Sequence, residues 1–264
     1  MKHLRITLLS VFVLLSVTSK GQAVTYIANV GVMVEIDEKK VLIDALFGQD
    51  NLKFDAPTPD QITEMVQGQA PYNKVDMVLF THAHDDHFDP LITLDYLKAN
   101  PTTKMIAPGQ ALDSMKAFGD VNDDISNRVL TYPWTKGWRV FTDGPITVKS
   151  AYAIHGGKIN FKVQNLIHIV QVGKKKVLHL GDTQMELSQI QNLRLNYEDI
   201  DVAIVPFWYL SSLYGGELLR NYVNAKKYVG VHLPVDGVES SLAKINEKFP
   251  EAIIFNSKGQ QVQF

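Results

Sequence analysis

The sequence predicts an α/β protein organised as a four-layer sandwich, in which two mixed β-sheets pack face to face between outer helices. Three observations predict this class. Short β-rich runs follow one another near the start of the chain and again in its second half. In each half, strands then alternate with helical segments. No short-period repeat and no Gly/Ser linker interrupts the chain, so we expect a single domain over residues 24–264.

The expected strands are apolar, β-branched runs bounded by turn residues. The first three are separated by Gly31 and by a polar turn at residues 37–39, which predicts an opening antiparallel meander. Residues 75–80 are apolar except for Asp76, as in a strand that is buried on both faces. The full set of expected strands is residues 24–30, 32–36, 40–44, 75–80, 104–107, 138–141, 146–155, 161–172, 176–180, 201–205 and 228–233.

The expected helices begin at capping residues and end at helix breakers. Asp89 and Pro90 supply an N-cap and a first-turn proline for a helix that runs to Ala99 and is closed by Asn100-Pro101. We expect a long surface loop at residues 47–60 and an insertion or connection around residues 108–133. The other expected helices are residues 110–118, 183–193, 216–228 and 238–249.

Composition excludes several classes of protein. The 264 residues are 45% hydrophobic and 20% charged, which is ordinary globular usage. The net charge of −2 provides no broad cationic surface, so we expect no nucleic-acid partner. The chain has no cysteine, which excludes disulfides, thiolate metal sites and cysteine nucleophiles. Any metal must therefore be bound by nitrogen and oxygen ligands.

Residues 1–23 have the pattern of a secretory signal peptide. Lys2 and Arg5 precede an apolar run at residues 6–17, and small residues follow at 21–23. The apolar run is shorter than the roughly 18 residues that a spanning helix needs. We therefore expect an exported protein, periplasmic or extracellular, without stable membrane insertion once the signal is removed; an uncleaved anchor is the alternative. Cleavage would remove three cations and leave a net charge of −5.

Three of the eight histidines lie within six residues, directly after the expected strand 75–80. The motif is Thr81-His82-Ala83-His84-Asp85-Asp86-His87. In extended geometry, His82 and His84 project to the same side and can chelate one ion. The chain then turns toward the helix at Pro90, which brings Asp86 and His87 toward a second ion. This short segment therefore predicts the start of two metal sites, although a solvated loop could hold the same residues without function.

Further ligands are expected at strand ends, where side chains leave a rigid sheet. His155 ends one expected strand, Asp182 follows another through Gly181, and His232 lies just before Pro234. Each of these residues taken alone is more often structural. Combined with the histidine-rich loop, they predict a dinuclear centre. His168 and His179 lie inside apolar strands, where we expect hydrogen-bonded imidazoles that at most support such a site.

These motifs resemble those of the metallo-β-lactamase-fold hydrolase superfamily. The matching pieces are residues 41–44, 81–87, His155, the His-Leu-Gly-Asp-Thr string at 179–183 and His232. The resemblance implies the αββα sandwich known as the metallo-β-lactamase fold. It implies that His82, His84 and His155 bind the first metal, that Asp86, His87 and His232 bind the second, and that Asp182 bridges both.

The same resemblance suggests further roles and a branch. Asp86 and Asp182 would be catalytic as well as metal-binding. Asp44 would support the metal ligands through hydrogen bonds, unless it only forms a turn. Residues 42–48, 81–90, 155–157 and 179–183 most resemble the branch that contains ascorbate-phosphate lactonase-like proteins and related phosphodiesterases.

Such a centre predicts hydrolysis of a small-molecule substrate. Two divalent ions can bridge a hydroxide that attacks an ester, lactone or phosphodiester. Zinc suits imidazole and carboxylate ligands, with manganese or iron as alternatives. Competing hypotheses are a periplasmic β-lactam hydrolase, a diiron redox protein and a non-catalytic metal-binding module. Candidate pocket residues are Phe47, Trp134, Phe207, Trp208, Tyr209 and Tyr214, and candidate anion-binding residues are Lys158 and Asn165. The sequence contains no signal for an oligomeric state.

Overall fold

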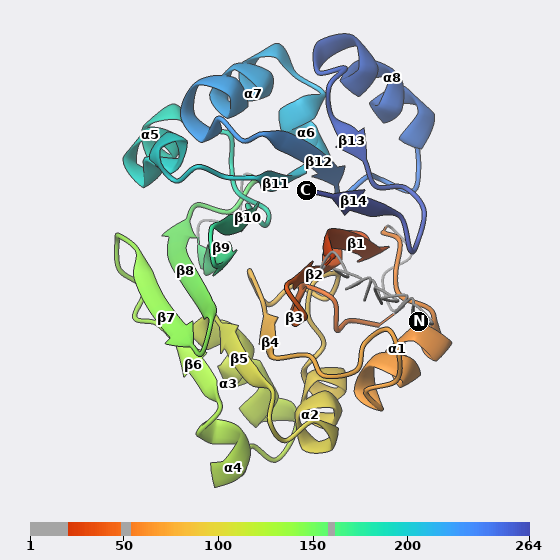
Figure 1. The fold of residues 1–264 in the computed structure, drawn as a ribbon, viewed down its shortest axis with the longest axis vertical. Helices are drawn as coiled ribbons and strands as arrows, with labels where there is room; N and C mark the ends of the chain where they lie inside the picture. Colours follow the sequence, from red (N-terminus) through yellow and green to blue (C-terminus); the bar gives the residue numbers. More distant parts are fainter. Residues whose placement is uncertain (1–20, 49–53, 158–161) are drawn as a thin grey trace, which may run out of the picture.

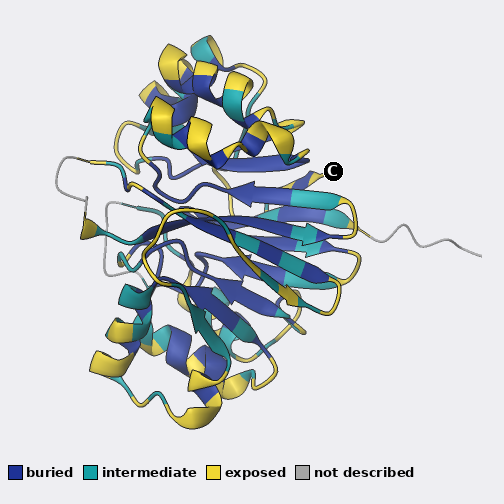
Figure 2. Cartoon of the chain, turned by 90° about the vertical axis from the view of Figure 1, so that its left-hand side faces the viewer, coloured by how far each residue is buried: buried dark blue, intermediate teal, exposed yellow. Residues whose placement is uncertain are grey.

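The computed structural model describes residues 21–48, 54–157 and 162–264. It confirms the predicted four-layer α/β sandwich, with two seven-stranded sheets between two layers of helices (Figures 1 and 2). Most of the predicted signal segment, residues 1–20, lies outside the described residues, as does Lys158. Gln22 and Ala23, which the prediction placed at the end of that segment, belong to the first strand.

The first sheet joins both ends of the described chain. Its strand order is β14-β1-β2-β3-β4-β5-β6. The pairs from β14 to β3 are antiparallel, which confirms the opening meander, and the pairs from β3 to β6 are parallel. The strands are β1 (Gln22–Ala28), β2 (Gly31–Ile36), β3 (Lys39–Ile43), β4 (Met77–Leu79), β5 (Lys104–Ala107), β6 (Val129–Thr131) and β14 (Gln261–Gln263).

The second sheet has the order β13-β12-β11-β10-β9-β8-β7. Its pairs from β7 to β10 are antiparallel and those from β10 to β13 are parallel. The strands are β7 (Arg139–Asp143), β8 (Ile146–Ala153), β9 (Asn165–Val172), β10 (Lys175–His179), β11 (Val202–Pro206), β12 (Lys227–Val231) and β13 (Ile253–Ile254).

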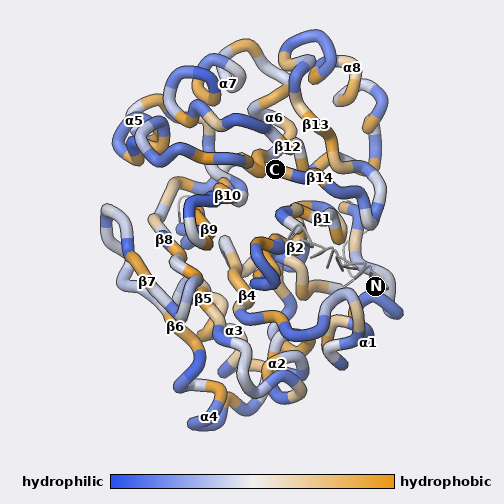
Figure 3. Tube along the Cα trace, in the orientation of Figure 1, coloured by the Kyte–Doolittle hydropathy of each residue, from blue (hydrophilic) through white to orange (hydrophobic). Residues whose placement is uncertain are grey.

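Helices cover the outer face of each sheet, α1–α4 on the first and α5–α8 on the second (Figure 1). Both hydrophobic and hydrophilic residues occur along outer helices such as α8, as expected of helices with one buried face (Figure 3). The helices are α1 (Pro59–Val66), α2 (Pro90–Ala99), α3 (Gly109–Phe118), α4 (Asp123–Ser126), α5 (Leu187–Leu193), α6 (Phe207–Leu210), α7 (Leu213–Leu218) and α8 (Val238–Lys248), with a 3₁₀ turn at Leu195–Tyr197 and a π turn at Leu219–Val223.

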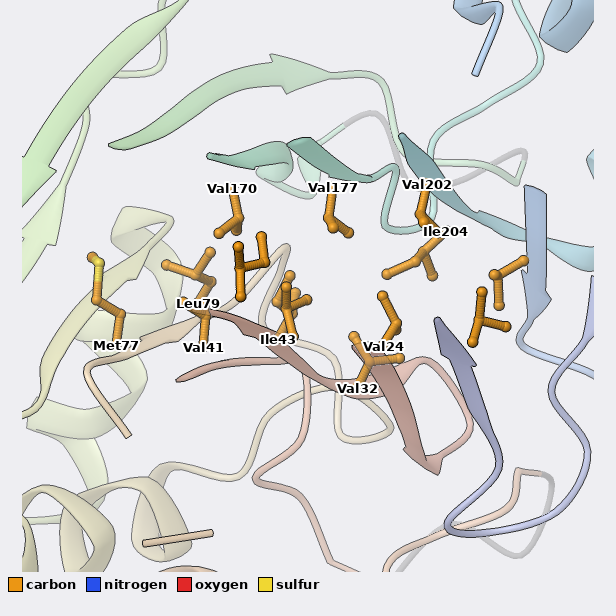
Figure 4. Packing of buried hydrophobic residues seen from close by; sticks show 14 of the residues in the cluster. Val24, Val32, Val41, Ile43, Met77, Leu79, Val170, Val177, Val202 and Ile204 are labelled. Atoms are coloured by element: carbon orange, nitrogen blue, oxygen red, sulfur yellow. The ribbon is translucent and has the colours of Figure 1, made fainter. Parts of the chain in front are cut away.

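The core between the sheets consists mainly of small branched side chains. Figure 4 shows Val24, Val32 and Ile43 of the first sheet facing Val177 and Ile204 of the second. Along β2, alternate residues enter this central core, whereas Met33 packs into the core beneath the helices. Because both faces of the sheet are covered, its strands read as continuous apolar runs rather than as alternating ones.

Several expected helices or loops differ from the structure. The predicted loop at residues 47–60 ends early because a capping box between Thr58 and Gln61 starts α1 at Pro59. The connection around 108–133 contains α4 and the edge strand β6. The expected helix at 216–228 is replaced by the end of α7, by the π turn, which ends at Asn224 in a left-handed conformation (φ 51°), and by the start of β12.

The expected helix at 183–193 also begins later, at Leu187, with Glu186 as its N-cap. The preceding residues are extended because Thr183 forms an isolated antiparallel bridge with His155, just beyond the end of β8. This bridge brings together two chain segments that each carry a predicted metal ligand. The late start of α5 therefore helps to bring His155 and Asp182 close together.

Candidate metal centre

The histidine-rich loop leaves the buried strand β4 and enters α2. Its turn is closed at His84, whose carbonyl accepts hydrogen bonds from the amides of His87 (3.1 Å) and Phe88 (2.9 Å). The Asp89 side chain then caps α2 by accepting from the amides of Leu91 and Ile92. Together, the turn and the cap direct the side chains of the loop toward the edges of both sheets.

The structure brings His82, His84 and His155 together. His82 Nε2 lies 3.0 Å from His84 Nδ1 and 3.2 Å from His155 Nε2. Three ring nitrogens at this spacing could hold one metal ion. His82 and His155 are buried, and His84 is partly exposed.

The second group comprises Asp86, His87 and His232, which could likewise hold an ion. His232 Nε2 lies 3.3 Å from Asp86 Oδ2, and His87 Nε2 lies 3.8 Å from the same oxygen. His232 reaches the site from the end of β12, where its backbone is left-handed (φ 63°) and its amide donates to the carbonyl of Asn29.

Asp182 lies between the two groups. Its Oδ2 is 3.2 Å from His232 Nε2 and 3.6 Å from His155 Nε2, and its Oδ1 is 3.4 Å from His87 Nε2. All seven side chains predicted from the sequence are therefore brought together, from both sheets and from chain positions 150 residues apart. The bridging role that the resemblance implied for Asp182 stays a prediction.

Three buried atoms of the seven candidate ligands have no hydrogen-bond partner among the described residues, and two of them, His87 Nε2 and Asp182 Oδ1, face each other; the third is His232 Nδ1. Leaving a buried polar atom unpaired is costly unless something else satisfies it. A nitrogen and a carboxylate oxygen that face each other can both be satisfied by one cation. The donor set, five imidazoles and two carboxylates, is one that binds divalent transition metals. The residues thus fit metal ions.

Asp44 orients histidines of both groups. Its Oδ2 accepts from His87 Nδ1 (2.9 Å) and from the Thr81 hydroxyl (2.6 Å), and its Oδ1 accepts from the Thr81 amide (2.7 Å). The Thr81 hydroxyl also lies 3.0 Å from His82 Nδ1 and can accept a hydrogen bond from it. Both rings are thereby held with Nε2 free to act as a ligand. The predicted supporting role fits this geometry better than that of a turn residue.

Sequence reasoning did not find Asn29, which holds the other side of the centre. The Asn29 side-chain amide donates to the carbonyl and to Oδ2 of Asp86, both at 3.1 Å. The backbone carbonyl of Asn29 accepts a hydrogen bond from the backbone amide of His232. The only local signal is an Asn in the turn between β1 and β2, with φ 48°, which indicates a turn and not a site.

The Asp182 turn is held by two buried side chains. Asn165 Oδ1 accepts from the Asp182 amide (3.2 Å), and Asn165 Nδ2 donates to Thr183 Oγ1 (3.1 Å). His179 Nδ1 accepts from the Gly181 amide, and its Nε2 donates to a backbone carbonyl. The amide group of Asn165 is therefore used within the protein, and the geometry gives no support to its expected role as an anion ligand.

Charges within the centre are strongly coupled. Burial raises the pKa of the Asp182 carboxyl, but His232 and His87 outweigh burial and hold that pKa well below its usual value. Burial lowers the pKa of His232, yet Asp182 and Asp86 raise it to about 9. Burial lowers the pKa of His82 well below its ordinary value. An ionised Asp182 and a neutral His82 are the forms that bind metals.

The centre opens into a cavity of about 630 Å³, here called the metal cavity. Its walls include Phe54, Met185 and Trp208 in addition to the acidic and imidazole groups. The rings of Phe54 and Trp208 both pack edge-on against His232, with centroid distances of 4.7 and 5.3 Å.

Of the aromatic residues proposed from the sequence, only Trp208 lines the metal cavity. Phe47 and Tyr209 are buried, Tyr209 in the core under the helices of the second sheet, and Tyr214 is exposed on α7. Trp134 lines a separate cavity. Cavity walls depend on how distant segments pack, which a single aromatic residue in a sequence does not reveal.

Comparison with known proteins identifies the family. A family model described as a beta-lactamase superfamily domain matches residues 39–247, most of the chain. The chain belongs to the β-lactamase superfamily. The matched range contains all seven predicted ligands and Asp44. No curated protein matches the sequence.

Solved structures show the metallo-β-lactamase fold of this superfamily. The chain is similar to the metallo-β-lactamase fold protein YhfI from Bacillus subtilis, with a TM-score of 0.63, 16% identity, and coverage of 93% of this chain and 100% of that one. It is similar to Igni18, a metallo hydrolase from Ignicoccus hospitalis, with a TM-score of 0.61, 17% identity, and coverage of 92% of this chain and 98% of that one. It is also similar to CmlA, a diiron β-hydroxylase from Streptomyces venezuelae, with a TM-score of 0.59, 11% identity, and coverage of 94% of this chain and 55% of that one. At such low identity, these likenesses establish the fold alone.

Proposed function

We propose that this member of the β-lactamase superfamily is a metal-dependent hydrolase of small esters or lactones. One observation carries the proposal: two buried, facing atoms, His87 Nε2 and Asp182 Oδ1, lack any other partner among the described residues, in the middle of seven potential ligands. Igni18, which is described as a metallo hydrolase, has the same fold.

In this proposal two divalent ions are bound, as the sequence motif suggested. His82, His84 and His155 would hold the first ion, and Asp86, His87 and His232 the second. Asp182 would contact both, since its two oxygens face different histidines. Zinc is the proposed metal because imidazole and carboxylate ligands suit it, and manganese and iron are the alternatives to test.

The protein contributes orientation and a controlled environment to the reaction. When bound, divalent ions lower the pKa of water and polarise the bond under attack. Asp44 keeps the ring of His87 in position, and Asn29 does the same for the carboxylate of Asp86. The depressed pKa of Asp182 keeps it ionised near neutral pH. Phe54 and Trp208 shield one side of His232 from water.

The metal cavity suits a small-molecule substrate. Its volume suits a small organic molecule, and apolar walls with a few polar groups are typical of such sites. Among the described residues that line it, three are aspartates and none is Lys or Arg. Two of these aspartates, Asp86 and Asp182, are proposed metal ligands, so bound divalent ions would offset their charge. Beyond the ions, no cationic side chain of the described lining would hold an anionic group, so we place esters and lactones first and keep phosphodiesters in the test.

Two other activities and one role without catalysis are further candidates for the same centre. A β-lactam hydrolase would turn over nitrocefin, and a chelator would abolish that turnover. A diiron oxygenase has a precedent on this fold in CmlA, but that protein is about twice as long as the part similar to this chain. A non-catalytic metal-binding module would bind metal and hydrolyse nothing.

The test is a substrate panel run together with metal analysis. Purified protein loaded with zinc, manganese or iron is assayed with lactones, p-nitrophenyl esters, bis-p-nitrophenyl phosphate and nitrocefin. We expect close to two metals per chain and turnover of esters or lactones, and we expect both to be lost in His84→Ala and Asp182→Ala. Asp95→Ala, an exposed carboxylate on α2, is the matched control and keeps both. Full turnover by Asp182→Ala would contradict the proposal.

We also propose export to the periplasm or the cell exterior, based on residues 1–23. Within the described residues, no helix is long and apolar enough to cross a membrane. Gln22 pairs with Ile36, and its carbonyl accepts from the amide of Phe264 (3.1 Å). Cleavage after Ala23, the predicted end of the signal, would therefore remove two residues of β1, whereas cleavage before Gln22 would leave β1 intact. Fractionation and intact-mass measurement of the mature chain test this. Full-length protein found only in the cytoplasm would refute export.

A further inference from the structure

A second cavity lies beside the metal cavity. It measures about 730 Å³ and lies between α5, the end of β8 and the segment that leads into β7. In Figure 1 the β7–β8 hairpin and α5 stand on the same side of the molecule. We call it the aromatic cavity, and its walls include Trp134, Trp138, Tyr152, Ile154, Gln189 and Leu193.

One ridge separates the two cavities. Ile154 lines the aromatic cavity, and the next residue, His155, lines the metal cavity. The carbonyl of Ile154 accepts from the amide of Gln184, which faces the metal cavity (2.8 Å). The Gln189 side chain binds both strands of the ridge, accepting from the Ile154 amide and donating to the Gln184 carbonyl. The hydrogen-bonded pair Ile154 and Gln184 therefore has one cavity on each side.

The polar atoms of two aromatic side chains in the wall, Trp138 and Tyr152, are already paired within the protein. Trp138 Nε1 donates to the carbonyl of Leu193 (3.2 Å), and the Tyr152 hydroxyl donates to the carbonyl of Tyr132 (3.0 Å). What these residues can still offer to a ligand is the face of the ring. An apolar group matches such a wall because it needs no hydrogen bonds.

Two large apolar side chains that line the aromatic cavity are half exposed. Trp134 is 52% exposed and Ile154 is 49% exposed. The Trp134 ring lies against that of Tyr152, with centroids 6.2 Å apart, so two aromatic rings form one wall. Aromatic faces pack best against other flat rings. Clustered exposed apolar side chains in a cleft are a sign of binding.

We propose that the aromatic cavity binds a neutral, flat apolar group of the substrate, such as a phenyl ring, beyond the bond that is cleaved in the metal cavity. The placement of the cleaved bond rests on the proposed hydrolase function, whereas binding of the flat group does not. The substrate is then an ester or lactone that carries an aryl-type group at some distance from its carbonyl.

The first test measures binding without catalysis. The probe is N-phenyl-1-naphthylamine, a neutral aromatic dye whose fluorescence rises in apolar sites, titrated into the metal-loaded protein. Trp134→Ala should weaken binding about tenfold through loss of ring stacking and buried area. The matched control, Phe118→Ala, removes an aromatic ring that is 67% exposed at the end of α3, and it should bind the dye as the wild type does. Equal affinity of Trp134→Ala and wild type would overturn the proposal.

The second test compares two esters with one leaving group, p-nitrophenyl acetate and p-nitrophenyl 4-phenylbutanoate. In Trp134→Ala the KM for the phenylbutanoate should rise about tenfold relative to the KM for the acetate, with the kcat ratio unchanged. If neither these esters nor the lactones of the panel are hydrolysed, the proposed function fails and the dye titration still decides the role of the cavity. If esters are hydrolysed but neither dye affinity nor the KM ratio responds to Trp134→Ala, the assignment of the aromatic cavity is wrong and the hydrolase stands.

Discussion

Asp44→Asn is the substitution for which the structure allows the most detailed expectation. The buried Asp44 carboxylate accepts three hydrogen bonds, two from Thr81 and one from His87 Nδ1. Asparagine has nearly the same shape but only one acceptor oxygen. In either orientation its NH₂ group faces a donor, so at least one hydrogen bond is lost and the negative charge disappears. Each charge-assisted bond contributes about 1.5–3 kcal/mol.

The expected consequence is weaker metal binding at both ion positions, since Asp44 orients His87 directly and His82 through Thr81. Loss of such a supporting partner typically lowers metal affinity 10–100-fold, equivalent to about 1.4–2.8 kcal/mol. Zinc affinity is measured by competition with a chromophoric chelator, with circular dichroism as a check on folding.

Asp201→Asn is the matched control for this prediction. Asp201 is also a buried carboxylate that accepts from a backbone amide and from a lysine, but it lies at the end of the sheet away from the centre. We expect this variant to lose stability without losing zinc affinity. If a folded Asp44→Asn protein bound zinc as tightly as the wild type, the supporting role of Asp44 would be refuted.

Three further substitutions probe the surroundings of the centre. Asn29→Ala removes both hydrogen bonds to Asp86 and should weaken zinc binding about tenfold in the same competition assay. Gly181→Ala adds a methyl group 2.7 Å from Thr81 Cβ at φ +53°, so thermal unfolding should show a loss of at least about 1–2 kcal/mol, and elemental analysis should show reduced metal. Burial lowers the pKa of His168 from 6.5 to about 4. The unfolded chain therefore takes up this proton first, and wild-type stability should fall by up to about 3 kcal/mol between pH 6.5 and 4. His168→Gln should lack this component in urea unfolding at pH 7.5 and 4.5, and parallel pH profiles for the two proteins would contradict it.

Much of the local structure is readable from short stretches of sequence. Helix α2 matches its prediction at both ends because Asp89 and Pro90 cap one end and Asn100-Pro101 close the other. Helix α1 was missed although Thr58 and Gln61 form a capping box, so its signal was present and was not used. The strands β6, β13 and β14 span two or three residues each and are too short for periodicity to reveal.

Some of the candidate metal ligands were predictable from local sequence, whereas the convergence of the others depends on tertiary packing. The four predicted ligands between His82 and His87 share one loop, so their spacing alone indicated a metal site. His155, Asp182 and His232 were anticipated at strand ends, but their convergence depends on how the second sheet packs onto the first. The supporting contact of Asn29 had no sequence signal, because it joins residues 57 positions apart.

Local pattern thus accounts for the fold class, for most strands and for the presence of a histidine-rich ligand loop, because periodicity, caps and chelate spacing act over a few residues. The packing of two sheets accounts for everything that depends on distance through space: the facing atoms of His87 and Asp182, the ridge at Ile154 and the two cavities beside it. Long-range burial positions those groups, and no short window of sequence encodes it.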